Sequence, residues 1–343
     1  MLSESSISTA DGSPGIPRAG LAAKLPVIPA AAFGMVLGLA GLANAWRAAH
    51  DAYQLPAAVG EAIMAAAAAV WAILLCLYAF KWWLTPRLAI AELHHPVQCC
   101  FVGLIGVATM LVAIGALPYD RTVGVALFAA GSLFTAGFAI WRTGLLWQGG
   151  RQDSDTTAVL YLPTVAGFFV TGTTAAALGR PDWGQLAFGA GLFSWFAIES
   201  ILVHRLFTAP SLLPALRPTL GIQMAPPVVG AVCYVSVTSG PPDIFIHALI
   251  GYGLLQSLFL LRLLPWIFRQ PFAASYWAFT FGATSLAAAP LRMVARGAEG
   301  PLAALAPILL AAATALVAAI ALGSLWLLLR GRLFPRPTTA SPK

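Results

Sequence analysis

Charged residues are scarce in this sequence. Only 9% of the 343 residues are Asp, Glu, Lys or Arg, whereas 59% are hydrophobic. Soluble globular proteins carry about 25% charged residues, so this chain has too little charge to cover a surface that faces water. The charged residues lie in short segments between long apolar runs, which is the pattern of a polytopic α-helical membrane protein.

Enzyme and metal-site signatures are missing as well. The sequence contains no Walker loop, no HExxH and no GxSxG, and its four cysteines lie in apolar stretches without metal-ligand spacing. We therefore predict no enzyme activity, no metal and no cofactor. The alternative from a different class is a membrane-embedded enzyme or a haem protein, for which His50 and His247 are the pair to consider.

The net charge of +7 comes from basic residues that occur singly, not in a block, so it does not indicate nucleic-acid binding. They follow the connections between apolar runs: fourteen of the nineteen Lys and Arg residues fall on one set of alternate connections and termini, and five on the other set. The positive-inside rule then places both termini in the cytoplasm, and we predict a bacterial inner-membrane protein.

Ten apolar runs are long enough to cross a hydrocarbon core of about 30 Å. We expect residues 1–24 to form a disordered cytoplasmic tail, 25–331 the transmembrane domain and 332–343 a second cytoplasmic tail. The ten expected spans are 26–46, 58–81, 96–115, 121–147, 160–179, 183–207, 219–239, 243–268, 272–295 and 301–330.

Every odd-numbered span has a proline near its start, and the even-numbered spans are smoother. This alternation predicts five helical hairpins. Irregular backbone at membrane depth is tolerated only where protein or a water-filled cavity covers it, so we expect the proline-marked helices to surround a central pore and the others to face lipid. The five prolines are Pro29, Pro96, Pro163, Pro226 and Pro271.

No odd-numbered span contains an acidic or basic residue near its middle, which argues against a cation pathway. All five odd-numbered spans start on the cytoplasmic side, where their N-terminal dipoles would attract anions. The acid at greatest depth is Glu199, on an even-numbered span, and we expect it to pair with Arg262 or Arg205. The alternative for Glu199 is a role in proton coupling.

The ninth span is unusually rich in aromatic and small residues. On a helical wheel at 100° per residue, its aromatic residues Phe272, Tyr276 and Phe279 share a face with Ala283. The opposite face carries Ala274, Ala278, Phe281 and Ser285, so that Phe281 is the single large side chain on a stripe of small ones. Such a stripe fits a narrow pore wall or a close helix contact.

Several ordered motifs resemble the tellurite-resistance/C4-dicarboxylate transporter family, whose bacterial members are the TehA proteins and whose distant members include the slow-type anion channels of plant guard cells. The resemblance covers roughly residues 25–330. The motifs are AFGMVLG (32–38), HPV (95–97), MLVAIG (110–115), LYLPTVA (160–166), GAGLFSW followed by Glu199 (189–199), LGIQMAP (220–226), GYGLLQSLFLLRLLPW (251–266) and QPFAASYWAFTFG (270–282).

The resemblance implies an all-α fold of ten helices in a pseudo-fivefold ring, with one pore per subunit in a homotrimer. It also implies passage of small inorganic or organic anions and a phenylalanine on the ninth helix that occludes the pore. That phenylalanine matches Phe281, beside Gly282. We assign small residues to the pore wall or to hinges beside it, namely Gly34, Gly103, Gly167, Gly230, Ala278, Gly282 and Ser285. A proton-coupled carrier of C4-dicarboxylates or tellurite is the alternative within the family.

Overall fold

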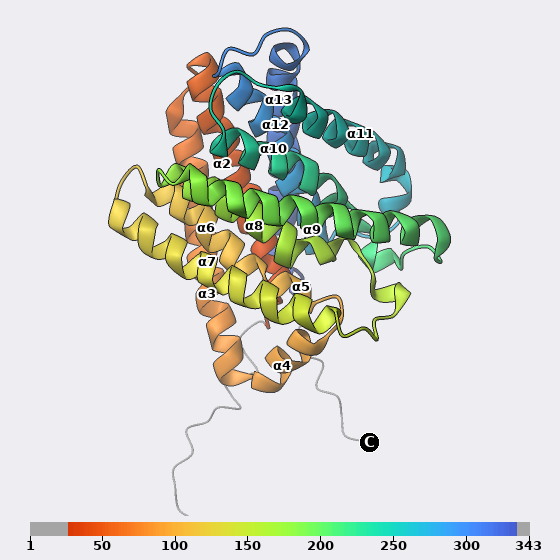
Figure 1. The fold of residues 1–343 in the computed structure, drawn as a ribbon. Coiled ribbons are helices and arrows are strands. Elements are labelled where there is room, and N and C mark those ends of the chain that lie inside the picture. The colour runs from red at the N-terminus through yellow and green to blue at the C-terminus, as the bar shows by residue number, and fades with distance from the viewer. Residues whose placement is uncertain (1–26, 335–343) are drawn as a thin grey trace, which may run out of the picture.

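The computed structural model describes residues 27–334 and shows an all-helical protein (Figure 1). The predicted tails, 1–24 and most of 332–343, lie outside the described residues. Apart from the surface helix α4 (Pro86–His94), the chain alternates between segments that begin irregularly and long regular helices. The long helices are α3 (Ala57–Leu84), α7 (Arg121–Leu146), α9 (Pro181–Thr208), α11 (Ile244–Ile267) and α13 (Pro301–Leu329).

Four of the other segments begin with a 3₁₀- or π-helical stretch, and the second begins with the four-residue α-helix α5 after a turn at residues 95–98. Proline has no N–H to donate and is therefore tolerated at the start of a helix, where no carbonyl partner is needed. These segments are η1 (Ala30–Phe33) with α2 (Gly34–Tyr53), α5 (Cys99–Val102) with α6 (Leu104–Ala116), η3 (Ala158–Leu160) and η4 (Leu162–Ala166) with α8 (Gly167–Ala177), η5 (Pro214–Met224) with α10 (Ala225–Val237), and η6 (Ala274–Phe279) with α12 (Thr280–Val294).

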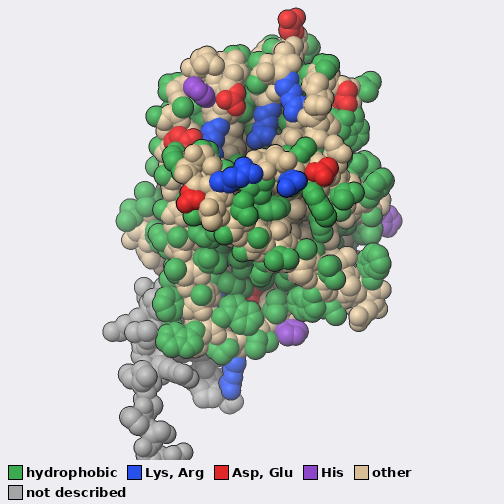
Figure 2. All heavy atoms as spheres, turned by 60° about the vertical axis from the view of Figure 1, so that its left-hand side comes forward, with side chains coloured by type: hydrophobic (Ala, Val, Ile, Leu, Met, Phe, Trp, Pro, Cys, Tyr) green, Lys and Arg blue, Asp and Glu red, His purple; other side chains and the backbone are tan. Residues whose placement is uncertain are grey.

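Within residues 27–334, eight helical segments are long and apolar enough to span a membrane. In three of them, each with an irregular start, 72–83% of the most apolar stretch is buried inside the protein, against 17–33% in the five long regular helices. The predicted division into an inner and an outer set is therefore present. Figure 2 shows hydrophobic side chains over the middle of the molecule and charged side chains gathered toward one end.

The two remaining predicted spans, 26–46 and 272–295, correspond to η1 with α2 and to η6 with α12, which are not among the eight. In α2 the hydropathy is reduced by Arg47, His50 and Asp51 near its end, and in η6 and α12 by small and hydroxyl residues. Both helices are packed largely against other helices, so they need less lipid-compatible surface than the outer set.

Consecutive segments pack as hairpins: α2 on α3, α6 on α7, α8 on α9, α10 on α11 and α12 on α13. The inner helices also contact one another, α2 with α6, α6 with α8, α8 with α10, α10 with α12, and α12 with α2. These inner contacts are close because glycine is placed at them. A Cβ on Gly38 of α2 would lie 2.3 Å from Thr280 Oγ1 of α12, and one on Gly172 of α8 would lie 2.6 Å from Cys233 Sγ of α10.

Candidate functional site

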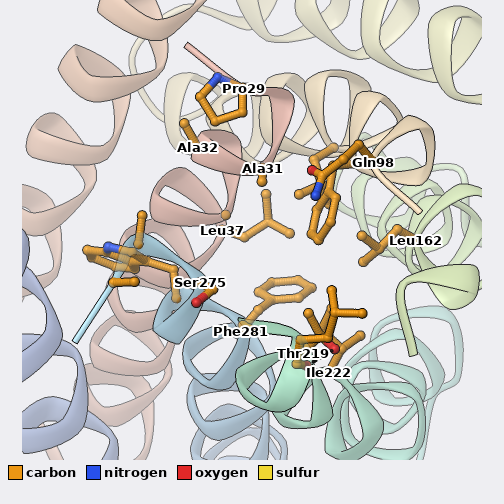
Figure 3. A pocket seen from close by; sticks show the side chains of 18 of the residues that line it. Pro29, Ala31, Ala32, Leu37, Gln98, Leu162, Thr219, Ile222, Ser275 and Phe281 are labelled. Carbon is orange, nitrogen blue, oxygen red and sulfur yellow. Dashed lines mark hydrogen bonds between the residues drawn. The ribbon is translucent and has the colours of Figure 1, made fainter. Parts of the chain in front are cut away.

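A cavity of about 820 Å³ lies among the starts of the inner segments. All five inner segments contribute to its wall, and α4 and the residues after α13 add to it. The lining is mostly hydrophobic, with Leu37, Leu104, Phe169 and Ile222 among its larger side chains. A few polar side chains are interspersed, including Gln98, Thr219 and Ser275 (Figure 3).

Phe281, in the first turn of α12, projects its ring into this cavity (Figure 3). The ring also packs against Gly41 of α2, where a Cβ would lie 3.3 Å from Phe281 Cδ2. Ser285, one turn further along α12, is buried and is not part of the cavity wall. The ring of Phe281 therefore lies where the cavity meets the closely packed part of the inner helices.

The other residues that we assigned to the pore divide into two groups. Gly34 and Ala278 line the cavity. The remaining glycines face helix contacts instead: a Cβ on Gly282 would lie 3.0 Å from Met224 Cε, one on Gly167 2.5 Å from Thr135 Cγ2, and one on Gly230 3.0 Å from Phe169 Cζ. Gly103 is packed in the same way against Phe138 and Pro163.

The first turns of the ninth span depart from the helical wheel. Residues Ala274–Phe279 form a 3₁₀-helix, which has 3.0 residues per turn, so a spacing of 100° misplaces its side chains. Trp277 of this 3₁₀-helix lines the cavity. Phe272, which the wheel placed away from the pore, lines it as well, because residues 271–273 before the 3₁₀-helix are not helical. Tyr276 and Phe279 do pack together, with ring centroids 6.4 Å apart.

One acidic side chain in the cavity wall is neutralised. Glu92 of α4 forms a salt bridge of 2.7 Å with Lys81, and both side chains are buried. Its other oxygen accepts a hydrogen bond of 2.8 Å from the backbone N–H of Ala30, and Tyr78 donates to the carboxylate at 3.0 Å. The pair therefore fixes α4 against the start of the first inner segment. The sequence analysis did not predict this ion pair, although Lys81 at the end of an apolar run could have indicated a charge that needs a partner.

Comparison with known proteins decides the family. Residues 28–325 match the family described as voltage-dependent anion channel, SLAC1. The chain belongs to the SLAC1 family. It is 36% identical over 261 residues to a tellurite resistance protein TehA homolog of Haemophilus influenzae, covering 76% of this chain and 79% of that protein. It is also 24% identical over 234 residues to an uncharacterized transporter of Methanocaldococcus jannaschii, covering 61% and 68%.

Membership of the SLAC1 family makes this a multi-pass membrane protein of an anion transporter and channel family, not of an enzyme family. The motifs that carried the resemblance lie in the matched region. In this family member no group of three or more His, Cys, Asp and Glu side chains within residues 27–334 could hold a metal ion. All four cysteines are free.

Glu199 has a different environment from the expected one. No Lys, Arg or His of the described residues lies within salt-bridge distance of it, so the ion pair with Arg262 or Arg205 is not formed. Its carboxylate instead accepts hydrogen bonds from five neutral side chains. These are Trp195 at 2.8 Å, Tyr252 at 2.7 Å, Gln223 at 3.1 Å, Gln256 at 3.4 Å, and the hydroxyl of Tyr161.

The physical reason is that neutral donors stabilise a carboxylate without the cost of burying a second charge. Four of the five donors lie on three segments other than α9, and sequence analysis did not identify them because a tyrosine or glutamine in an apolar run gives no sign of its partner. The donors belong to α9 itself, to the start of the third inner segment, to η5 and to α11.

Proposed function

We propose that this protein passes small anions through the cavity, with the ring of Phe281 as the constriction that occludes the path. The observation that carries the proposal is the projection of Phe281 into a cavity enclosed by all five inner segments. A phenylalanine ring in a narrow apolar path obstructs an ion because the ion must give up hydration water there and receives no polar contact in return.

A ring architecture fits the helix contacts. The five inner helices contact one another in a cyclic order, and each has its own outer helix. This supports ten spans arranged as five hairpins with pseudo-fivefold symmetry. In that arrangement α2 and the η6–α12 segment are the two further spans, and their lower hydropathy follows from their burial beside the path.

The electrostatics of the cavity favour anions. All five inner segments begin at the cavity, so their N-terminal backbone dipoles present partial positive charge to it. Glu92, the acidic side chain in the cavity wall, is paired with Lys81. A cation pathway would be expected to expose carboxylates that have no such partner.

The cellular setting follows from the same features. The distribution of Lys and Arg supports a location in a bacterial inner membrane with both termini on the cytoplasmic side. The cavity would then open toward the cytoplasm, because the inner segments start on that side. We further propose a homotrimer with one path in each subunit, on the resemblance to the TehA family, and a monomeric mass in detergent would contradict it.

The alternative is a proton-coupled carrier for C4-dicarboxylates or for tellurite, the latter suggested by the name of the Haemophilus influenzae relative. A carrier is expected to bind its cargo at polar groups near the midplane, whereas this cavity is mostly hydrophobic. That difference favours a passive path for small anions.

Ion selectivity provides the test. With purified protein in planar bilayers and a potassium chloride gradient, we expect the reversal potential to lie near the chloride equilibrium potential, because the dipoles and the paired Glu92 disfavour potassium. Replacing chloride on one side by a large organic anion is expected to shift the reversal potential, because the chloride equilibrium potential changes with the chloride concentration on that side. A reversal potential near that of potassium would contradict anion transport.

A further inference from the structure

One face of α12 continues from Phe281 to the end of the molecule at which the inner helices finish. This end lies opposite the cavity, and we call it the distal end. In an α-helix with 100° per residue, Arg292 lies about 20° from Phe281 around α12 and ~17 Å further along it. Between them the same face carries Ser285 and Ala288, which are both small. The face that projects the Phe281 ring into the cavity therefore also presents a guanidinium at the distal end.

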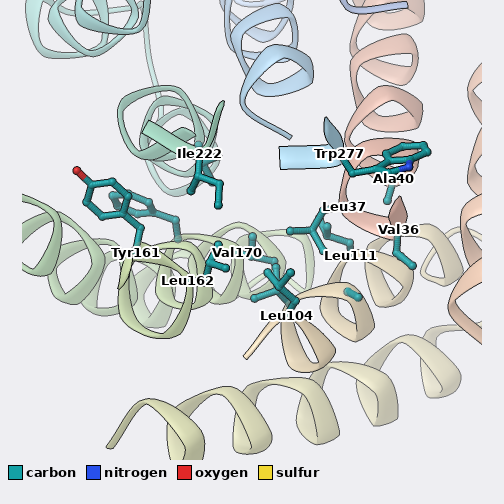
Figure 4. Packing of buried hydrophobic residues seen from close by; sticks show 14 of the residues in the cluster. Val36, Leu37, Ala40, Leu104, Leu111, Tyr161, Leu162, Val170, Ile222 and Trp277 are labelled. Carbon is teal, nitrogen blue, oxygen red and sulfur yellow. The ribbon is translucent and has the colours of Figure 1, made fainter. Parts of the chain in front are cut away.

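Two other inner helices continue from the cavity wall in the same way. Leu37 of α2 and Val229 of α10 line the cavity. Figure 4 shows Leu37 pointing into the space between the inner helices, as Leu111 of α6 does. Around the same helices, Asn44 lies about 20° from Leu37 and Ser236 about 20° from Val229. Asn44 and Ser236 are only partly buried although they lie on inner helices, so both border open space toward the distal end.

Charged side chains gather at the distal end (Figure 2), and some of them bind the ends of inner helices. The C-terminal carbonyl groups of a helix carry partial negative charge, which would repel an anion there. Three arginines offset this charge, each by donating a hydrogen bond to a carbonyl oxygen at the end of an inner helix: Arg121 to Leu178 after α8 (3.2 Å), Arg296 to Thr238 after α10 (2.8 Å) and Arg47 to Gly115 of α6 (3.5 Å).

Arg292 has a different environment. Its Nη1 donates to Ser236 Oγ at 2.7 Å, and this hydroxyl donates to the Val232 carbonyl oxygen at 2.7 Å, so the guanidinium is held in one orientation. Among residues 27–334 no carboxylate lies within 4 Å of it, and the exposed Asp51 of α2 also lies beyond that distance. Its Nε and Nη2 are neither hydrogen-bonded to these residues nor enclosed. This edge offers two parallel N–H donors that match an anion.

We propose that Arg292, oriented by Ser236, is an anion-binding site at the distal end of the path, on the other side of the Phe281 ring from the cavity. Its ligand is one small inorganic anion or carboxylate, held by the free guanidinium edge. At the cavity the N-terminal dipoles of the inner segments attract anions, but at the distal end the same dipoles have the opposite sign. A side-chain cation is therefore needed there, and Arg292 supplies it.

The effect on conduction rests on the proposed function. In the Phe281→Ala background, where the constriction is removed, Arg292→Gln should reduce anion current that enters from the distal side by about fivefold at low chloride. This is the order expected for one elementary charge at ~5 Å in a partly hydrated site. Planar-bilayer recording with chloride on one side at a time measures each direction. No reduction, or an equal reduction from both sides, would overturn the site.

Two variants separate the local charge from other causes. Arg292→Lys keeps the charge and should restore most of the distal entry, whereas a purely structural role of the guanidinium would leave it low. Arg180→Gln removes an exposed guanidinium from the connection before α9, at the same end of the molecule. It should leave the entry of anions nearly unchanged. A loss as large as that of Arg292→Gln would indicate a general effect of surface charge and overturn the proposal.

A further variant covers the case in which Arg292→Gln does not fold. Asn44→Asp keeps the shape of the side chain and adds a negative charge on the face of α2 that continues from Leu37. We expect it to lower anion entry from the distal side. Unchanged entry would mean that this face does not border the path, and the proposed site would be wrong.

Chloride binding is measured separately from conduction by thermal unfolding of the full-length protein in detergent. Chloride is exchanged for gluconate, an anion too large for a site inside the bundle, at constant ionic strength. Chloride should raise the melting temperature of the unmodified protein and of Arg180→Gln but not that of Arg292→Gln. This pattern without any current in Phe281→Ala would support the site and refute conduction. No stabilisation of the unmodified protein by chloride would overturn the site.

Discussion

Phe281→Ala is expected to raise anion conductance by at least ~30-fold, which corresponds to a barrier lowered by ~2 kcal/mol. The ring projects into the cavity and lies against Gly41 of α2. Its removal opens space at the point where the cavity meets the closely packed inner helices. Single-channel recording in planar bilayers measures the change directly, because it separates conductance per pore from the amount of protein inserted.

Two comparison variants make that result specific. Phe193→Ala removes a ring that is 72% exposed on the outer face of α9 and should leave conductance unchanged. Phe279→Ala removes a buried ring that packs on Gly221 of η5, outside the cavity wall. A large increase in Phe279→Ala with none in Phe281→Ala would contradict the assignment of the constriction.

Gly38→Val is expected to prevent correct assembly of the inner helices. A Cβ at this position would lie 2.3 Å from Thr280 Oγ1, 2.8 Å from Thr280 Cβ and 2.9 Å from Trp277 Cε3, all on the η6–α12 segment. Because both side chains are buried, neither can move away freely. Overpacking of this kind costs about 3 kcal/mol, and we expect a large loss of thermal stability and of monodisperse protein in detergent.

The matched control is Gly189→Val on α9. It introduces the same side chain into a membrane-spanning helix, but a Cβ at position 189 would have no neighbour within 4 Å. Its thermal unfolding should resemble that of the unmodified protein. Equal destabilisation by the two variants would indicate a general intolerance of valine in these helices, not a contact between α2 and α12.

The repeat and the division into inner and outer helices could be predicted from sequence because both have a local cause. A proline at the start of every second span reflects the backbone conformation of that span and does not depend on a distant partner. The smooth apolar composition of the alternate spans likewise reports their exposure to lipid. Hairpin pairing then follows from the short connections.

Details within the inner segments were harder to predict because they depend on partners far away in sequence. A wheel at 100° per residue assumed an α-helix from residue 272 onward, whereas residues 271–273 are not helical and Ala274–Phe279 is 3₁₀, so the wheel misplaced Phe272. Gly167 and Gly230 satisfied the pattern of small residues, but that pattern serves a helix contact as well as a pore wall. Thr135 lies beside Gly167 and Phe169 lies beside Gly230, so both glycines are at helix contacts.

The electrostatics of Glu199 could not be predicted for the same reason. A carboxylate in an apolar span needs stabilising partners, and sequence offers charged candidates such as Arg262 more visibly than neutral ones. The neutral donors Tyr161, Gln223 and Tyr252 come from three different segments. Only the folded structure, in which these side chains meet at the carboxylate, shows that neutral donors take the place of a cation.

Thiol accessibility on the two sides of Phe281 tests the central claim most directly. In a protein whose four native cysteines are replaced by alanine, Ala278→Cys places a thiol on the cavity wall and Ser285→Cys places one beyond the ring. With a membrane-impermeant thiol reagent applied from the cytoplasmic side, we predict rapid reaction at position 278 and none at position 285. Adding Phe281→Ala should make position 285 reactive. Equal reaction at position 285 with and without the Phe281 ring would contradict the account.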